Sequence, residues 1–441
     1  MPRSASSPQY LETRRLSKNQ LFAMRASHEE GLGWDTRRPS DHNYLFVPGR
    51  LLVDTEDAGL DQVIDVFNRR KSDFRIASAP ERDDARTPKI DGLDSYRFES
   101  RERRPDESDA AYERARRRDL VNAVRIYDDE LGPGVVTPEH YVHLAGTGNG
   151  RACPATEPAE TVLAQAWPEA ETDKSVGDGA SVVVIDTGWP QPAIAAAASE
   201  AARTGDYAHL PVLQPYAGHG LFAEEVVRSR APGADIQHLE FPIDSGGAIN
   251  EVDLAHLLAQ ALAMRPQVIN MSAGCHTRQD RPLKAFERAW RNQPADPKDR
   301  PVVIAAAGND ASPSPFYPAA SPWAIGVGSL DQDNEVSSFS NYRQSADVFL
   351  LGRNHVNRFP IGTYTCHWSP NVGNHRMFTT GYARWSGTSF AAPFLAGLVA
   401  AHVSTYPGTP REAARDLIRH KRVWRNHPLY GDHRKIRFRD L

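Results

Sequence analysis

The sequence predicts an α/β protein with a doubly wound, mostly parallel sheet, preceded by a smaller α+β domain. After residue 176, short apolar, β-branched runs alternate with helical patterns, which is typical of buried parallel strands joined by crossover helices. Before residue 147, strand and helix patterns follow a different order, and a segment rich in Gly, Pro, Thr and Ala separates the two regions. A chain of 441 residues has room for both domains.

Composition indicates an ordinary globular protein, with 40% apolar and 24% charged residues. The 52 basic and 56 acidic residues balance too evenly to indicate a nucleic acid or a membrane surface as a partner. Residues 1–30 lack the apolar core of a signal peptide and no run reaches about 18 apolar residues, so we expect a cytoplasmic protein. We expect the cysteines Cys153, Cys275 and Cys366 to be reduced, because they are too few and too far apart for a disulfide framework.

The first region begins with a polar, Ser- and Arg-rich stretch over 1–43, which we interpret as an N-terminal extension. The run "YLFVPGRLLV" at 44–53 then predicts a strand interrupted by a Pro-Gly bend. Apolar residues follow at helical spacing over 60–67. A strand followed by a helix is therefore expected here.

A charged, loop-rich stretch over 71–107 contains the strand-like run "SYRFE", and Ser108 then opens a long helical pattern. Its "RARRR" run is interpreted as a solvated helix face, because an apolar stripe runs along the same helix and acidic residues alternate with the arginines. "GVVTPEHYVHLAG" at 134–146 predicts an edge strand, since a proline lies near its start. We assign 44–146 to one α+β domain and 147–175 to a linker.

The second region, 176–441, carries the pattern of the doubly wound sheet. The expected strands are 181–186, 234–241, 267–272, 301–308 and 323–328. The clearest helix between them covers 251–264, with Asn250 as a candidate N-cap. In such sheets, ligand sites form at the carboxyl ends of the strands.

Four polar residues lie at predicted strand ends or helix starts. Asp186 ends "SVVVID", His219 precedes a helix, Asn309 follows "AAAG", and Ser389 begins a helical run. Each one alone has an ordinary explanation as a cap, a turn residue or a helix-start serine. Together they are the types that acyl transfer requires: a nucleophile, a general base, a group that orients the base, and a donor to the oxyanion.

The same segments resemble the motifs of the subtilisin-like serine peptidases. "VVVIDTG", "GHG", "AAAGN" and "SGTSFAAP" match the aspartate, histidine, asparagine and serine motifs of that family, in the family's order. The resemblance spans about 176–410. It implies that Asp186, His219 and Ser389 form a catalytic triad, and that Asn309 supplies the side chain of the oxyanion hole.

Substrate-binding residues are also implied by the resemblance. "INMSAG" is similar to the family's segment that pairs with extended substrate, and "AAAG" lies next to the oxyanion asparagine. The expected substrate-binding residues are Ser272, Ala273, Gly274, Ala306, Ala307 and Gly308.

Two positions depart from the family pattern. The histidine motif continues with Leu221-Phe222 where the family usually has Thr-His, which makes the local packing larger and more apolar. Cys275 stands where the family often has a second glycine, either as a buried structural residue or as one that narrows a pocket. Neither change removes a group that the chemistry needs.

The domain at 44–146 resembles a family propeptide by its order and size. This resemblance implies an intramolecular inhibitor of the active site and predicts self-cleavage within 143–175. The expected partners are therefore a protein or peptide substrate and the chain's own N-terminal domain, with no nucleic acid and no membrane.

Two other functions stay open at this point. The chain can be a catalytically silent or permanently inhibited binding module with the same fold, or an esterase or amidase with the same triad. His219 and Asn309 argue against the sedolisin relatives, which use glutamate and aspartate at these places. No cofactor is expected, and the group Cys366, His367 and His375 matches no standard metal-site spacing.

Overall fold

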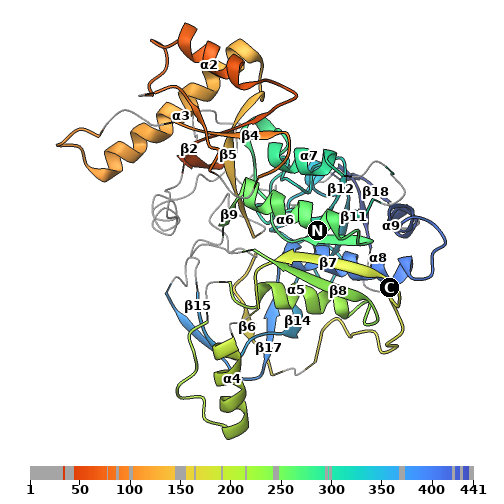
Figure 1. The fold of residues 1–441 in the computed structure, drawn as a ribbon. Coiled ribbons are helices and arrows are strands. Elements are labelled where there is room, and N and C mark those ends of the chain that lie inside the picture. The colour runs from red at the N-terminus through yellow and green to blue at the C-terminus, as the bar shows by residue number, and fades with distance from the viewer. Residues whose placement is uncertain are drawn as a thin grey trace, which may run out of the picture.

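In the residues that it describes, the computed structural model shows two large sheets with helices packed around them, and two small sheets of two and three strands (Figure 1). The described residues are 33–34, 44–76, 78–85, 89–98, 103–144, 155–162, 165–189, 192–213, 216–241, 248–293, 296, 300–366, 373–419, 423–427 and 431–436. Most of the predicted extension at 1–43 lies outside them, as do Cys153 and His367.

Within the described residues, the larger sheet has eight strands in the order β18-β19-β13-β12-β11-β10-β7-β8. They are β7 Ser181–Asp186, β8 Asp235–Glu240, β10 Val268–Met271, β11 Val302–Ala306, β12 Ala324–Leu330, β13 Val348–Leu351, β18 Val423–His427 and β19 Gly431–Lys435. All neighbouring pairs are parallel except β18 and β19. The predicted parallel sheet is confirmed, and its five expected runs correspond to β7, β8, β10, β11 and β12.

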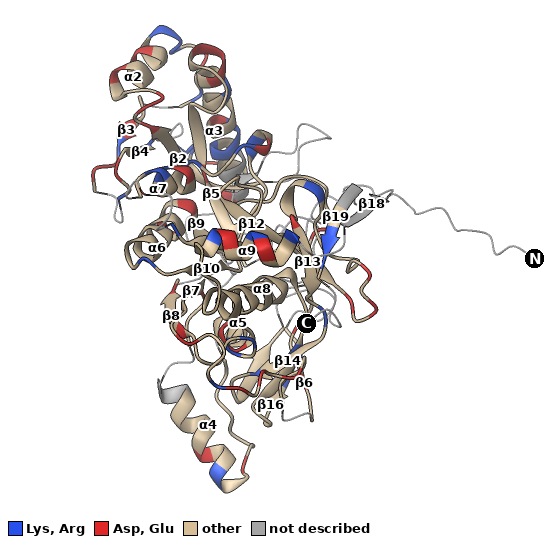
Figure 2. Cartoon of the chain, turned by 90° about the vertical axis from the view of Figure 1, so that its right-hand side faces the viewer, with Lys and Arg blue, Asp and Glu red and all other residues tan. Residues whose placement is uncertain are grey.

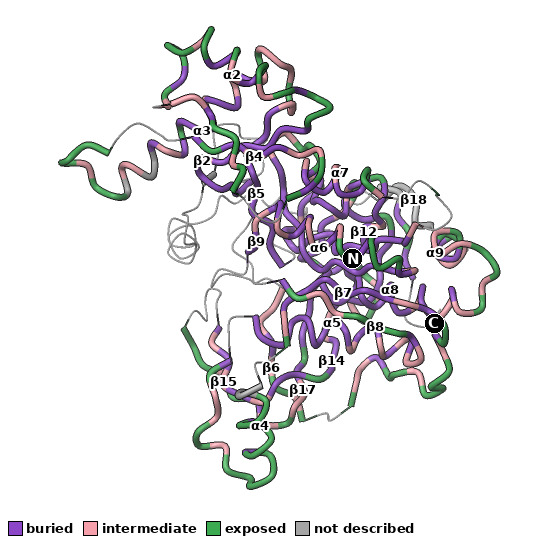
Figure 3. Tube along the Cα trace, in the orientation of Figure 1, coloured by how far each residue is buried: buried purple, intermediate pink, exposed green. Residues whose placement is uncertain are grey.

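Helices cover both faces of this sheet, because successive strand residues point to opposite sides. Val183 and Ile185 of β7 belong to the core under two helices, α6 Glu251–Ala263 and α7 Lys284–Arg291. Val182 and Val184 instead belong to the core under α5, α8 and α9. These helices are α5 His219–Arg228, α8 Thr388–Val403 and α9 Pro410–Arg419. Figure 3 shows the inner strands of this sheet and α8 mostly buried.

The strand β8 differs from the prediction of a buried strand. It lies at the edge of the sheet, pairs only with β7 there, and has partly or fully exposed residues along its length. An apolar run of ordinary length does not reveal which strand is outermost, because strand order depends on crossovers between distant segments.

The second sheet contains most of the N-terminal module, the name used below for residues 44–144. Its path is β3-β4-β2-β5-β9, with β1 paired to β2. The strands are β1 Gly33–Trp34, β2 Leu45–Asp54, β3 Glu81–Arg82, β4 Leu93–Arg97, β5 Val136–His143 and β9 Ala248–Asn250. Two helices, α2 Leu60–Arg69 and α3 Asp109–Leu131, close the module's own apolar core. Ser108 caps α3, as predicted, by accepting a hydrogen bond from Ala111 N.

The Pro-Gly bend predicted in the first strand does not interrupt it. β2 runs from Leu45 to Asp54, and the bend appears as a register shift between Phe46 and Leu51 against β5. Gly49 has φ +80° there, a conformation that suits glycine.

The prediction that 134–146 is an edge strand is wrong. β5 pairs with β2 on one side and with β9 on the other, and β9 lies directly before α6. Pro138 is compatible with this position because β9 pairs only with Tyr141, Val142 and His143. The sheet of the N-terminal module therefore continues into the region that follows it.

Several smaller elements complete the described chain. They are α4 Pro192–Thr204, β6 Ala159–Glu160, β14 His355–Arg358, β15 Gly362–Thr365, β16 His375–Phe378, β17 Tyr382–Trp385 and the single-turn helices η1 Arg278–Asp280 and η3 Arg343–Ser345. Part of the predicted linker packs against β14 and β17, because β6 pairs with β17 and Trp167 pairs with Val356 of β14. The helix α4 projects from the lower end of the molecule in Figure 1.

Candidate active site

Asp186 is the last residue of β7 and is fully buried. Its Oδ1 accepts a hydrogen bond from the backbone N–H of Thr187 at 2.7 Å and lies 2.6 Å from Nδ1 of His219. The carboxylate therefore fixes the ring at Nδ1 and leaves Nε2 for other chemistry.

His219 is the first residue of α5 and is also fully buried. Gly218 before it has φ +83°, and a Cβ there would lie 2.5 Å from Pro360 Cδ, so this turn requires glycine. Thr187 Oγ1 accepts a hydrogen bond from Gly220 N at 3.0 Å, which ties the start of α5 to the end of β7. The aspartate and the histidine are thus held by adjacent elements.

Aromatic rings surround the imidazole of His219. Its centroid lies 5.5 Å from that of Trp385 and 5.4 Å from that of Phe390. Phe222, one turn after His219, packs on Phe390 at 4.5 Å and on Trp385 at 5.7 Å. The large residue that departs from the family pattern at 222 therefore belongs to the apolar cluster beside the histidine.

Ser389 is the second residue of α8, directly before Phe390, whose ring contacts His219. The serine is fully buried. Within the described part of the chain, Ser389 Oγ and His219 Nε2 are both buried without a hydrogen-bond partner. The fold therefore brings a buried hydroxyl into the neighbourhood of the open nitrogen of a carboxylate-bound imidazole.

Pro393 explains an unusual contact of Ser389. In a helix, the backbone N–H of residue 393 would donate to the carbonyl of residue 389, but proline has no such N–H. Ser272 Oγ instead donates to Ser389 O at 3.0 Å, and Ser272 Oγ accepts from Asn270 Nδ2 at 3.1 Å. The proline thus frees the carbonyl that links the serine helix to the end of β10.

Asn309 follows β11 and is held by the residue before the serine. Its Oδ1 accepts hydrogen bonds from Thr388 N at 2.9 Å and from Thr388 Oγ1 at 3.0 Å. Gly308 N donates to the same hydroxyl at 3.1 Å. Because the amide oxygen is occupied in this way, the amide nitrogen is the end that can donate to a ligand.

The six predicted substrate-binding residues lie at the ends of two neighbouring parallel strands. Ser272, Ala273 and Gly274 follow β10, while Ala306, Ala307 and Gly308 end β11 and follow it. All six are buried. Since β7, β10 and β11 are parallel, both segments lie at the same end of the sheet as Asp186, with 272–274 on the strand next to β7 and 306–308 one strand further.

The end of β5 lies along this edge as an extended chain. His143 N donates to Gly274 O at 3.1 Å, and Gly274 N donates to His143 O at 2.7 Å. On its other side the same stretch pairs with β9. Sequence reasoning missed β9, because a strand of three residues shows no periodicity.

Charged contacts attach the N-terminal module to α7. The acidic turn after β2 faces the basic side of α7. In Figure 2 the red of the acidic residues meets the blue of the basic residues there. The ion pairs are Asp54 with Arg291 at 2.6 Å and Arg288 at 3.4 Å, Glu56 with Arg288 at 2.6 Å and Arg291 at 3.1 Å, and Asp57 with Lys284 at 2.6 Å. The hydrogen bond from Arg288 holds the pKa of the Glu56 carboxyl below its ordinary value.

A buried pair adds to this attachment. His140 of β5 contacts Glu251, the first residue of α6, with 2.9 Å between Nδ1 and Oε2. The other oxygen of Glu251 accepts from Ala285 N at 2.9 Å. One carboxylate therefore joins β5, α6 and α7.

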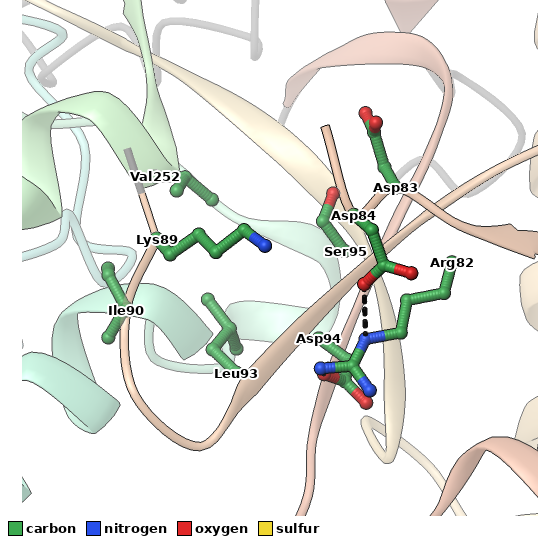
Figure 4. Close-up of a pocket in the computed structure, with 9 residues that line it drawn as sticks. All are labelled: Arg82, Asp83, Asp84, Lys89, Ile90, Leu93, Asp94, Ser95 and Val252. Carbon is green, nitrogen blue, oxygen red and sulfur yellow. Dashed lines mark ion pairs between the residues drawn. The ribbon is translucent and has the colours of Figure 1, made fainter. Parts of the chain in front are cut away.

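A small pocket lies where the N-terminal module meets α6 (Figure 4). Its lining residues are Arg82, Asp83, Asp84, Lys89, Ile90, Leu93, Asp94, Ser95 and Val252. None of the predicted catalytic or substrate-binding residues contributes to it. Charged side chains already pair within it, Arg82 with Asp84 at 3.2 Å and with Asp94 at 3.0 Å.

A second histidine lies behind the aspartate. His238 Nε2 is 2.9 Å from Thr187 O, and its Nδ1 is 3.4 Å from Glu224 Oε2. Burial lowers the pKa of His238, but hydrogen bonding to Glu224 and the charge of Asp186 outweigh burial, so its pKa lies above the ordinary value. For Glu224, burial raises the pKa of the carboxyl, but the hydrogen bonds from His238 and Arg228 outweigh burial, so its pKa lies below the ordinary value.

Two of the three cysteines lie in the described part of the chain. Cys275 and Cys366 are free and buried, and burial raises the pKa of the Cys275 thiol well above its ordinary value. A thiol of this kind is a poor nucleophile. In the described ranges, no group of three His, Cys, Asp or Glu side chains is placed to hold a metal ion, and no helix is long and apolar enough to span a membrane.

Comparison with known proteins places these residues in a family. The sequence model of the subtilase family matches residues 177–434. The thermophilic serine proteinase of Bacillus sp. (strain AK1) is 34% identical over 158 residues, which are 36% of this chain and 33% of that protein. Thermitase of Thermoactinomyces vulgaris is 28% identical over 253 residues, 55% of this chain and 79% of thermitase. The solved structure of the prenylagaramide maturation protease PagA is 21% identical, with a TM-score of 0.44 over 58% of this chain and 88% of that one.

Proposed function

Because the chain belongs to the subtilase family of serine endopeptidases, we propose that it hydrolyses peptide bonds through an acyl-enzyme on Ser389. His219 is the general base and acid, Asp186 orients it, and Asn309 donates to the oxyanion. The observation that carries this proposal is the 2.6 Å contact between Asp186 Oδ1 and His219 Nδ1, at a buried ring whose Nε2 has no partner among the described residues.

In the first half of the reaction, Ser389 Oγ forms a bond with the substrate carbonyl carbon while its proton passes to His219 Nε2. The carbonyl oxygen becomes an oxyanion beside Asn309. When the peptide C–N bond breaks, His219 returns the proton to the leaving amine and the acyl group stays on Ser389. In the second half, His219 takes a proton from water, water attacks the ester, and Ser389 leaves with the proton.

The carboxylate of Asp186 stabilises the imidazolium that exists between these proton transfers. Its charge matters because the ring is fully buried and water cannot solvate the positive form. The proposal therefore assigns Asp186 both an orienting and an electrostatic role.

Replacing Asn309 with alanine should lower kcat about 100- to 1000-fold and change KM little. That range is the one known for the oxyanion asparagine of subtilisin, a member of the same family. The amide is needed mainly when charge develops on the oxygen, so substrate binding is affected less. Steady-state hydrolysis of a peptide by the two proteins measures the change.

Thr388 supplies the control for this substitution, because its contacts with Asn309 Oδ1 position the amide. Thr388→Ser keeps the hydroxyl and should retain most of the activity. An Asn309→Ala protein with unchanged kcat would contradict the oxyanion role.

We further propose that the N-terminal module inhibits the active site as a product-like strand. The last strand of the module lies between β9 and Gly274, where an extended substrate would pair. Self-cleavage is expected shortly after Leu144, within the range 143–175. In this proposal the module is a separate folding unit with its own core, and the linker predicted over 147–175 connects it to the peptidase.

The ion pairs on α7 predict how tightly the cleaved module is held. Arg291→Ala removes contacts to both Asp54, which is fully buried, and Glu56. Because Arg291 is 46% exposed, its effect is reduced by solvent, and we expect inhibition by the module to weaken about tenfold at low ionic strength. The difference should shrink in high salt, where charges are screened.

Retention of the cleaved fragment on size-exclusion chromatography, together with peptide hydrolysis, measures this change. Arg203→Ala is the matched control, since Arg203 pairs with Glu200 inside α4. Equal fragment release by both variants would contradict the role of the α7 contacts.

A further inference from the structure

We infer that Phe316 closes the side-chain pocket beside the reacting bond, so that this peptidase cuts after alanine or glycine. The inference rests on the proposed function of Ser389 and adds a substrate class to it. Phe316 is fully buried and precedes Tyr317, which pairs with Cys275. It was not among the residues that sequence reasoning singled out.

The position of the reacting residue follows from the register of β5. His143 pairs with Gly274, and in antiparallel pairing each step forward on one strand is a step backward on the other. If one substrate residue pairs with Gly274 as His143 does, the substrate residue two positions later therefore lies opposite Ser272. Ser272 Oγ contacts the backbone of Ser389. The carbonyl of that substrate residue therefore lies between Ser389 and Asn309.

The side chain of the same substrate residue must enter between the two segments that flank Ser389. These segments are 272–274 and 307–309, which follow adjacent parallel strands. Each segment has a glycine facing the space between them, Gly274 in one and Gly308 in the other. Glycines at such places leave room for a neighbouring group.

In this chain, the neighbouring group is the ring of Phe316. A Cβ built on Gly274 would lie 2.3 Å from Phe316 Cε1, and one built on Gly308 would lie 3.0 Å from Phe316 Cγ. The ring therefore packs against both glycines and fills the space that a large substrate side chain needs. Little room remains beyond a methyl group.

The ring is held where it is by three contacts. The backbone of the next residue, Tyr317, exchanges two hydrogen bonds of 2.8 Å with Cys275. Phe316 N donates to Ser345 Oγ at 2.9 Å. The ring of His276 packs edge-on against Phe316, with centroids 5.3 Å apart and an interplanar angle of 80°. A swing of Phe316 away from the glycines would break this packing.

The chain's own sequence agrees with a small residue at the cut. The second residue after His143 is Ala145, and Gly146 follows it. Both residues lie outside the described part of the structure, so this support comes from the sequence alone. It is independent of the packing of Phe316.

The test compares peptide substrates that differ only in the residue before the cut. We expect kcat/KM for alanine to exceed that for leucine or phenylalanine by about 100-fold or more in the unmodified chain. Phe316→Ala should raise cleavage after leucine and phenylalanine at least tenfold while cleavage after alanine changes little. The ratio of kcat/KM for two substrates does not depend on the fraction of active sites that the N-terminal module blocks, because that fraction lowers both values equally.

Phe286→Ala is the control, since Phe286 is a fully buried phenylalanine of α7 and is not among the nearest neighbours of Gly274 or Gly308. It should change stability without changing the preference. Phe316→Leu, a smaller change in volume, replaces Phe316→Ala if that protein does not fold.

Equal cleavage after alanine and phenylalanine by the unmodified chain would overturn the inference. An alanine preference that persists in a folded Phe316 variant would overturn it as well. Failure of the proposed function looks different: no peptide is cleaved, and Ser389 does not react with a fluorophosphonate probe.

Discussion

A Ser389→Ala protein should be folded, should hydrolyse no peptide above background, and should not react with a fluorophosphonate probe. Loss of the nucleophile costs about a millionfold in kcat in subtilisin, so the expected effect is larger than for any other single change. Folding should be preserved because Ser389 Oγ is buried without a hydrogen-bond partner among the described residues. Removing such a hydroxyl leaves no partner unsatisfied.

The same variant decides between the peptidase and a silent binding module. Mass spectrometry of the unmodified protein should show a cut shortly after Leu144, and the Ser389→Ala protein should remain intact. Ser404→Ala is the control, since Ser404 lies at the other end of the same helix. Labelling or self-cleavage that persists in Ser389→Ala would exclude Ser389 as the nucleophile, and an uncut, unreactive unmodified protein would favour the binding module.

The second large effect is expected for Asp186→Asn, with kcat lowered about 10,000-fold. A loss of this size is typical when the aspartate of a serine-peptidase triad becomes asparagine. If the new amide nitrogen faces Nδ1, it donates a proton there and places the ring proton on Nε2, where the serine needs an acceptor. If the amide oxygen faces Nδ1, the tautomer is kept but the buried imidazolium loses its counter-charge.

Three measurements separate this role from a purely structural one. In Asp186→Asn, the rate of fluorophosphonate labelling should fall in proportion to kcat, KM should stay within a few-fold, and the melting temperature should change little. Asp235→Asn, at an exposed carboxylate on the neighbouring strand β8, should leave all three unchanged. A loss of kcat below tenfold in Asp186→Asn would contradict the assigned role.

Local patterns predicted the framework of the site but not everything that holds it. The strands β7, β10 and β11 are short apolar runs that end in a small or polar residue or are followed directly by one, and this signal is visible in the sequence. The contacts of Thr187 with Gly220 and of Thr388 with Asn309 are not visible, because they join residues 33 and 79 positions apart. Nothing in a local pattern records such pairs.

The errors have the same origin. β5 was predicted as an edge strand because proline disfavours interior strands, yet its second partner β9 is a three-residue segment more than 100 positions later. β8 was predicted as buried because its composition is that of an interior strand. Phe316 attracted no attention, because only the fold shows that its ring faces two glycines.

The shared sheet makes departure of the N-terminal module costly for the module itself. If the module separates after the proposed cut, Tyr141, Val142 and His143 lose their hydrogen-bonding partner β9. The unpaired backbone N–H and C=O groups on that side of β5 are then exposed to water, as in an edge strand. We expect a module released in this way to fray at its end and to become a substrate for proteolysis, including by the peptidase itself. Activation of the peptidase is then expected to be irreversible, because the module that could inhibit it again is degraded.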